Sequence, residues 1–598
     1  MEPALAVPVP SLAMAQDSQF TKEESVTVSS AASSEHSIYK TGEGFPRKLA
    51  KYSFAKSKRS KLFWWLTGTT LVIMIALALT LGLVLGLAGK SHAANIDLTV
   101  DLGYSKYQGQ NENNGVSHWW GIRYAAPPVG DLRFRAPQDP AVDTTLQQAN
   151  THSKVCRSSP STSADPDHSE DCLFLDVYAP TSSDSAKPVF VWFSGGGFNT
   201  ISDPNKNGAK LVQASNSGMV VVTFNYRVGP YGFIASKEVQ ANGDLNNGLK
   251  DQRKVLEWIQ KYIHLFGGDP KHVTIGGASA GGASVDLHLS AYGGRDDGLF
   301  HAAAAESQSF GAQLTVAESQ YQYDALVKRV GCDTAPDTLK CLRSADIADN
   351  NPNVPTPGGS GGDPVFMWSN VIDGNFTPDY TYKLFDQGKF VKVPVIFGDV
   401  SNEGTLFTPQ GATNFQNYDD VNAFLKNNYV QLNAAQLAQI DHFYPKAEQF
   451  PGQGPYWRTA ANAYGEMRYN CPGIFVSYSY PRYGVSQSWN YHWDYLPDGA
   501  NAALGVQHTA ESGSVWGTTD TPLNTAIQSY WMSFIMNKDP NQFKVNGAPA
   551  NLPTWGTFSQ GSMQRILFNN KGVSMENVDA TQQVRCAYLT AIGGDVRQ

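Results

Sequence analysis

The chain has 598 residues, of which 41% are hydrophobic and 16% are charged, and its formal net charge is −8. This much apolar material can bury a large core, which excludes wholesale disorder. The acidic balance argues against nucleic acid as a partner. Six cysteines in so long a chain exclude a small disulfide scaffold.

A long apolar segment lies near the start of the chain. Residues 62–89 contain no charged side chain. A helix of that length would span roughly 42 Å, more than the ~30 Å hydrocarbon core of a bilayer requires. The segment is too long and begins too late for a cleavable signal peptide. We therefore predict a transmembrane signal-anchor helix over residues 62–89, with the lipid bilayer as its partner.

The flanks of this segment predict its orientation. Residues 45–61 contain seven Lys and Arg residues, including Lys61, and no acid, whereas the other flank carries only Lys90 nearby. The positive-inside rule then places residues 1–61 in the cytosol, as a disordered tail with a basic juxtamembrane run. Residues 90–598 form one extracytosolic domain of a single-pass type II membrane protein. Small residues after Lys90 leave open whether the anchor is cleaved and the domain shed.

The first part of this domain alternates strands and helices. Residues 188–194 and 219–226 are continuous apolar runs, as expected of strands buried on both faces. Residues 247–266 carry apolar side chains at helical spacing and end at a pair of glycines. A short strand, residues 272–277, follows. This order predicts an α/β fold with a mostly parallel sheet.

Two glycine-rich turns then indicate chemistry. The strand 272–277 leads into Gly277-Ala278-Ser279-Ala280-Gly281 and a helix of small residues, the context of a nucleophile elbow, in which a sharp turn aims the serine hydroxyl away from the sheet. Gly195-Gly196-Gly197 directly follows the strand 188–194. We expect the N–H groups of Gly196, Gly197 and Ala280 to form an oxyanion hole.

Further motifs carry a family resemblance. They are GIRYAAPPVGDLRFRAP (121–137), SEDCLFLDVYAP (169–180), NYRVGPYGF (225–233) and WMSFIMNKDPN (531–541). With the elbow, and in this order, they resemble the type-B carboxylesterase/lipase family of α/β-hydrolases, which includes cholinesterases and fungal lipases. The likeness covers nearly all of residues 95–590. It implies an α/β-hydrolase fold and a serine carboxylic ester hydrolase that acts on a small-molecule ester. No cofactor is expected, and no cluster has metal-ligand spacing.

The remaining catalytic residues follow from chain order, which in this fold is serine, acid, histidine. Glu403 comes after the strand-like residues 393–399, where the family has its glutamate, and Asp399 is the alternative acid. His508 lies in a G-x-x-H-x-x-E segment that resembles the family's, whereas His492 alternates along an aromatic strand and is interpreted as structural. We predict that Ser279 attacks, His508 transfers the proton and Glu403 orients His508.

The six cysteines and one N-glycosylation sequon are consistent with an oxidising compartment. The sequence by itself leaves the pairing of the six cysteines open. The resemblance implies the pairs Cys156–Cys172, Cys332–Cys341 and Cys471–Cys586. Asn375, followed by Phe376 and Thr377, is a predicted N-glycosylation site.

Two differences from the family's sequence pattern narrow the class of ester that we expect as substrate. The 15 residues between Cys156 and Cys172 are polar and include no aromatic side chain, and Ala278 stands where the family usually has glutamate. Choline esters and interfacial activation on oil are therefore not favoured, and we expect an esterase with an open gorge. One alternative is a catalytically silent adhesion or receptor protein of the same fold. Another is a serine peptidase with an N-terminal anchor, although Ser279 comes early in the chain for that class.

Overall fold

The computed structural model describes residue 74 and residues 94–161, 165–349, 351–559 and 561–598. The predicted tail, residues 1–61, and the predicted membrane segment, apart from Met74, lie outside the described residues. Within the part of the chain that is described, no helix is both long enough and apolar enough to cross a bilayer. Residues 91–598 make up one unit by their internal contacts, and all that follows concerns this unit.

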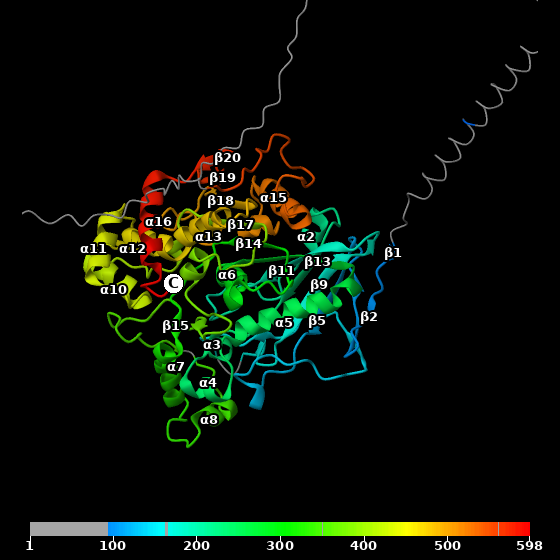
Figure 1. Cartoon of the computed structure of the whole chain (residues 1–598), viewed down its shortest axis with the longest axis horizontal. Helices are drawn as coiled ribbons and strands as arrows, with labels where there is room; N and C mark the ends of the chain where they lie inside the picture. The colour runs from blue at the N-terminus through cyan, green and yellow to red at the C-terminus, as the bar shows by residue number, and fades with distance from the viewer. Residues whose placement is uncertain (1–73, 75–93, 162–164, 350, 560) are drawn as a thin grey trace, which may run out of the picture. The chain divides into compact units, whose positions relative to one another are not determined.

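A sheet of eleven strands runs through the described residues in the order β4-β5-β9-β12-β11-β13-β14-β17-β18-β19-β20 (Figure 1). The seven strands from β12 to β19 are parallel to one another, and antiparallel pairs lie at both edges. The strands are β4 Gln110–Asn111, β5 Val116–Arg123, β9 Phe174–Pro180, β12 Val220–Phe224, β11 Lys187–Phe193, β13 Gly268–Ala278, β14 Ala302–Glu306, β17 Val395–Val400, β18 Ser488–Asp494, β19 Gln564–Asn569 and β20 Gly572–Asn577.

Both faces of the central strands are buried, as their apolar sequences predict. In β11, Val189, Val191 and Phe193 join one core, whereas Phe190 and Trp192 join a second core on the other face. Helices from different parts of the chain cover the two faces. They are α5 (Asn247–Tyr262) and α6 (Ala280–Gly294) over the first core, and α2 (Ala209–Ala214) and α15 (Asn524–Asn537) over the second. The predicted α/β fold with helices on both faces is thereby confirmed.

The predicted helix over residues 247–266 is also confirmed. It comprises α5 and a following 3₁₀ turn, Ile263–Phe266. Gly267 then adopts a φ of 79°, in the left-handed region where a helix commonly terminates at glycine. This turn brings the chain back into β13, which ends at the predicted elbow.

A third cluster of helices supports the loop after β17. It contains α10 (Tyr418–Asn428), α11 (Ala434–Phe443), α12 (Trp457–Gly465), the start of α13 (Cys471–Arg482) and α16 (Ala580–Gly593), and these helices gather at one end of the sheet (Figure 1). Helix α12 packs on the 3₁₀ turn that begins at Glu403, so closely that a Cβ on Gly404 would stand 1.9 Å from the carbonyl oxygen of Ala461. The loop that carries Glu403 is therefore fixed by packing.

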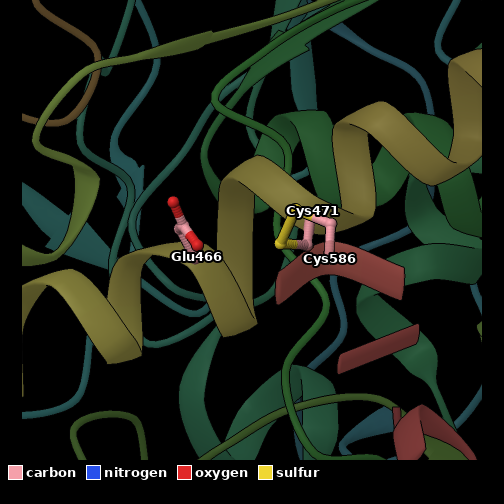
Figure 2. A group of neighbouring side chains, drawn as sticks. All are labelled: Glu466, Cys471 and Cys586. Carbon is pink, nitrogen blue, oxygen red and sulfur yellow. A yellow bond between two sulfur atoms is a disulfide. The ribbon is translucent and has the colours of Figure 1, made fainter. Parts of the chain in front are cut away.

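Three disulfides connect the cysteines in the pairs that the resemblance implies. Cys156–Cys172 and Cys332–Cys341 close short loops of the chain. The third, Cys471–Cys586, spans 115 residues in sequence and joins α13 to α16 (Figure 2). It fastens the last helix to the cluster that supports the Glu403 loop.

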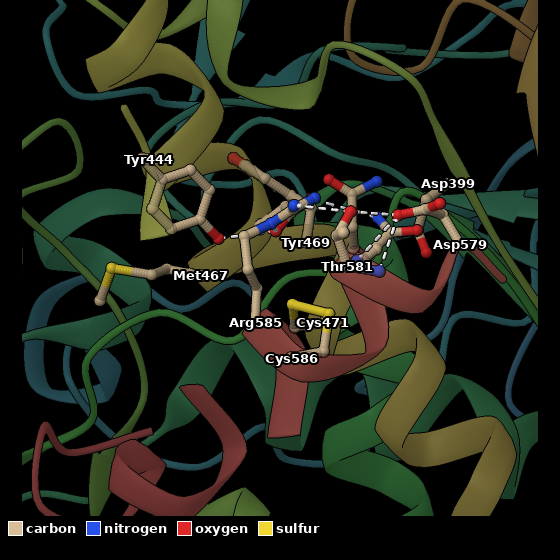
Figure 3. The surroundings of a disulfide bond; sticks show 12 residues. Asp399, Tyr444, Met467, Tyr469, Cys471, Asp579, Thr581, Arg585 and Cys586 are labelled. Carbon is tan, nitrogen blue, oxygen red and sulfur yellow. Dashed lines mark hydrogen bonds and ion pairs between the residues drawn. A yellow bond between two sulfur atoms is a disulfide. The ribbon is translucent and has the colours of Figure 1, made fainter. Parts of the chain in front are cut away.

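Glu466 lies beside this disulfide. It and the two sulfurs bring three potential metal-ligand atoms within 4.8 Å of one another (Figure 2). Both sulfurs are already bonded to each other. The Glu466 carboxylate accepts hydrogen bonds from Arg585, at 2.6 and 2.7 Å, and from the hydroxyl of Tyr444, at 2.6 Å. Figure 3 shows Tyr444 and Arg585 near the disulfide. These contacts account for the group as a structural ion pair beside a disulfide.

Candidate active site

Ser279 occupies a strained turn between β13 and α6. Its φ of 59° and ψ of −122° lie where few residues other than glycine are found. The turn is tight because its neighbours are small: a Cβ on Gly281 would stand 1.9 Å from the carbonyl oxygen of Phe193. The Ser279 N–H donates to the carbonyl oxygen of Glu306 at 3.0 Å, which ties the turn to β14. This is the geometry of a nucleophile elbow.

The glycine loop after β11 lies against this serine. A Cβ on Gly195 would stand 3.1 Å from the Ser279 Cβ. Gly197 has a φ of 62°, and a side chain there would strike the ring of Phe366 at 2.1 Å, so only glycine fits. The N–H groups of Gly196, Gly197 and Ala280 donate to no other group among the described residues. They are therefore available to an oxyanion.

The structure brings His508 and Glu403 into contact. The Nδ1 atom of His508 lies 2.5 Å from Oε2 of Glu403, and the other carboxylate oxygen accepts the Val400 N–H at 2.9 Å. The rings of Tyr469 and Phe407 pack on the imidazole, with centroids 4.6 and 4.8 Å away. Within the described structure Nε2 of His508 has no hydrogen-bond partner. Donation from Nδ1 to Glu403 leaves the lone pair of Nε2 free to accept a proton.

The two alternative residues have other partners. Asp399 accepts a hydrogen bond from Nε2 of Gln308 at 3.1 Å. Burial, together with the neighbouring Glu403 carboxylate, raises the pKa of Asp399 well above its ordinary value. His492 contacts Glu576 through Nδ1 and Ser401 through Nε2, each at 2.8 Å. His508 and Glu403 therefore form an imidazole–carboxylate pair that includes neither alternative residue.

Two further buried glutamates beside this pair were not singled out from the sequence. Glu306 ends β14 and is 0% exposed, and neither of its carboxylate oxygens has a hydrogen-bond partner in the described structure. Burial raises the pKa of Glu306 to about 8, an effect that the Lys206 ammonium opposes. Glu511 accepts the hydroxyl of Tyr491 at 2.8 Å. Burial and the neighbouring carboxylates of Glu306 and Glu403 raise the pKa of Glu511 well above its ordinary value.

A cavity of about 580 Å³ opens over Ser279 and His508. One contiguous part of its lining, which we call the aromatic wall, consists of Val365, Phe366, Leu406 and Phe407. A second part, the polar wall, consists of Thr200, Ser202, Asp203, Lys206, Ser512 and Thr518. Neither wall was predicted, although an Asp and a Lys three residues apart shortly after the glycine loop are a visible signal in the sequence. The cavity is large enough for a small organic ester.

Comparison with known proteins identifies the family of this chain. The model of the carboxylesterase family matches residues 97–587. The chain belongs to the carboxylesterase family. The protein is a carboxylic ester hydrolase of the α/β-hydrolase fold.

Individual members of the family are fungal lipases and esterases. Secreted lipase 4 of Gibberella zeae is 32% identical over 73% of this chain and 81% of its own length. Lipase 1 of Geotrichum candidum is 31% identical over 78% of this chain and 90% of its own. The crystal structure of Aspergillus niger EstA is similar to this one with a TM-score of 0.79 and 39% identity, and the match covers 84% of this chain and 99% of that one.

Proposed function

We propose that the carboxylesterase hydrolyses its ester through an acyl-enzyme on Ser279. His508 takes the hydroxyl proton on Nε2 while Oγ of Ser279 attacks the ester carbonyl carbon. The N–H groups of Gly196, Gly197 and Ala280 bind the resulting oxyanion. His508 then gives the proton to the departing alcohol, and the same steps with water release the acid.

One observation carries this proposal. The imidazole of His508 has Nδ1 on the Glu403 carboxylate and an unpartnered Nε2, and it lines the same cavity as Ser279 and the glycine loop. The Glu403 carboxylate holds the tautomer and stabilises the imidazolium that forms during attack. A catalytically silent adhesion protein is not favoured, because the related proteins named above are lipases and esterases.

Replacement of the serine tests the proposal. We expect Ser279→Ala to lower kcat for p-nitrophenyl butyrate by at least about 10⁴-fold, as loss of a serine nucleophile does elsewhere. Ser290→Ala is the matched control, because Ser290 is a buried serine of the same helix whose hydroxyl donates to the Asp286 carbonyl oxygen. An Ser279→Ala protein that keeps its thermal melting temperature and its turnover would contradict the proposal.

Membrane attachment is a second part of the proposal. We infer that residues 62–89 anchor the protein with residues 1–61 in the cytosol and the esterase domain in an oxidising compartment. The uncharged segment, the basic run before it and the three disulfides support this topology. The full-length protein should remain in the membrane fraction after carbonate extraction. When protease is added outside sealed microsomes, it should remove only the tail and leave the esterase domain intact. Extraction into the soluble fraction without cleavage would contradict the anchor, whereas a shortened soluble form would indicate shedding.

The short polar loop between Cys156 and Cys172 supports an esterase with an open gorge rather than a lipase activated at an interface. Rates on tributyrin should follow ordinary saturation through the solubility limit. A sharp rise in rate above that limit would contradict the open gorge.

A further inference from the structure

Two charged side chains hold one part of the cavity lining in a fixed arrangement. The Lys206 ammonium lies 2.8 Å from Oδ2 of Asp203 and 3.5 Å from the hydroxyl of Ser512. It also lies over the rings of Trp192 and Trp516, 5.1 and 4.7 Å from their centroids. The Lys206 side chain is only 15% exposed. Several interactions therefore hold the Lys206 side chain in place at the cavity wall.

The Asp203 carboxylate remains partly open. Its side chain is 37% exposed. Among the described residues only Oδ2 takes part in a hydrogen bond, so Oδ1 can accept another. The hydroxyls of Ser202 and Ser512 line the same cavity. Ser202 borders the nucleophile, because its Oγ and the Ser279 Cβ lie 3.0 and 3.1 Å from the point where a Cβ on Gly195 would stand.

The charges of this wall exclude two kinds of ligand. Lys206 neutralises Asp203, so the pair attracts neither an anion nor a cation strongly. Trp192 and Trp516 are buried, and the Lys206 ammonium covers their indole faces, so they offer no cation–π surface to a quaternary ammonium ligand. A strong, fixed hydrogen-bond acceptor and several hydroxyls remain, and these are the groups that recognise hydroxyls of a ligand.

The aromatic wall has the opposite chemistry. Phe366 rests on Gly197 of the glycine loop, and Phe407 packs on His508. The two rings contact each other with centroids 5.5 Å apart. Leu406 beside them is 49% exposed, so the apolar surface continues to the mouth of the cavity. Such a surface favours a hydrocarbon chain.

We propose that the natural substrate is an ester of an apolar acid with a polyhydroxy alcohol, such as a glycerol or sugar ester, and that Asp203 selects it. The acyl chain lies on the aromatic wall, and a hydroxyl of the alcohol donates a hydrogen bond to Oδ1 of Asp203. This inference rests on the proposed function. Asp203 acts on specificity and takes no part in proton transfer.

A matched pair of esters tests the selection. Glyceryl 1-monobutyrate and propyl butyrate share the acid and the carbon skeleton of the alcohol and differ by two hydroxyls. The full-length enzyme should have a kcat/KM at least about tenfold higher for glyceryl monobutyrate, since a site built to bond a hydroxyl discriminates against an analogue that lacks it. In Asp203→Asn the ratio of the two kcat/KM values should fall toward one, and in Ser512→Ala it should fall by less.

Asp184→Asn is the control for the loss of an acidic partner. Asp184 pairs with Lys187 at 2.8 Å and the same three-residue spacing, but at the opposite end of β11 from the cavity. In Asp184→Asn the ratio of the two kcat/KM values should match that of the wild type. Thermal melting of each variant separates a change in specificity from a failure to fold.

Three results would overturn the proposal. The first is a wild-type ratio near one, and the second is a ratio that Asp203→Asn leaves unchanged. The third is a preference that arises when the hydroxyls are on the acid instead, in methyl 3,4-dihydroxybutyrate against methyl butyrate. Failure of the serine mechanism would be seen separately, as turnover of p-nitrophenyl butyrate that survives in Ser279→Ala.

Discussion

Glu403 and Glu306 are the same residue type at nearly the same depth, 1% and 0% exposed. Each contacts a residue that lines the cavity: the Glu403 carboxylate contacts His508, and the Glu306 carbonyl oxygen accepts the Ser279 N–H. Glu403 accepts hydrogen bonds from His508 and from the Val400 N–H. Glu306 accepts none from the described residues, and burial raises its pKa to about 8. The comparison shows that the two carboxyls differ in their donors, and that burial without a donor within hydrogen-bond distance accompanies the raised pKa of Glu306. Of these carboxylates, Glu403 is the one that contacts the imidazole of His508 in the described structure.

The largest effect should come from the glutamate that pairs with His508. We expect Glu403→Gln to lower kcat for p-nitrophenyl butyrate by about 10³-fold or more, because an amide no longer stabilises the imidazolium and can favour the wrong tautomer. Steady-state kinetics near pH 8 would measure this loss.

Asp399→Asn is the control for Glu403, because Asp399 is also buried but bonds Gln308 instead of the imidazole. It should keep kcat within about tenfold of the wild type. If the two variants exchanged these effects, Asp399 would be the orienting acid.

The next effect concerns stability and its dependence on pH. Glu306 has its ordinary pKa of 4.5 in the unfolded chain and a pKa of about 8 in the folded protein. Between these values the folded protein binds more protons than the unfolded chain, so this group lowers the stability as the pH rises. Glu306→Gln does not titrate. Its melting temperature relative to the wild type should therefore increase from pH 5 to pH 8, by a few degrees.

The surface variant Glu257→Gln serves as the reference for this measurement. Glu257 is half exposed on α5 and 3.7 Å from Lys254. The difference in melting temperature between Glu257→Gln and the wild type should hardly change over the same pH range. A Glu306→Gln difference that is equally flat would mean that Glu306 is ionised in the folded protein at pH 5.

The smallest effect is expected at Glu511, whose side-chain donor among the described residues is the hydroxyl of Tyr491. Tyr491→Phe leaves that buried carboxyl without the donor. We expect the free energy of unfolding to fall by about 1–3 kcal/mol, the usual penalty for an unsatisfied buried group, with kcat changed only slightly. Urea unfolding would measure it. An unchanged urea midpoint in Tyr491→Phe would show that the Tyr491 hydroxyl does not stabilise the folded protein.

Local patterns predicted much of this site. The elbow, the glycine loop and the strands before them are each encoded by a short run of residues, because a sharp turn demands small neighbours and a buried strand demands a continuous apolar sequence. The element bounds agree closely: the apolar run 188–194 is β11, Lys187–Phe193.

The surroundings of the site could not be predicted in this way. Phe366, Phe407 and Lys206 come from three separate loops that meet only after the sheet has formed. Glu306 reaches Ser279 because β14 pairs with β13 in a register that sets Ala278 beside Glu306. Such contacts depend on topology, and a single sequence carries no periodic signal for them. The pairing of Glu403 with His508 was predictable only through the family resemblance.

The conformation of Ser279 has a consequence for protein engineering. A residue with a φ of 59° and a Cβ carries roughly 1–3 kcal/mol of backbone strain. Glycine would relieve that strain, whereas alanine would retain it, so Ser279→Gly should be a more stable protein than Ser279→Ala although neither has a nucleophile. A selection for thermal tolerance alone would therefore reward loss of the one hydroxyl on which turnover depends. Directed evolution of this enzyme needs a screen that reads activity and heat resistance together.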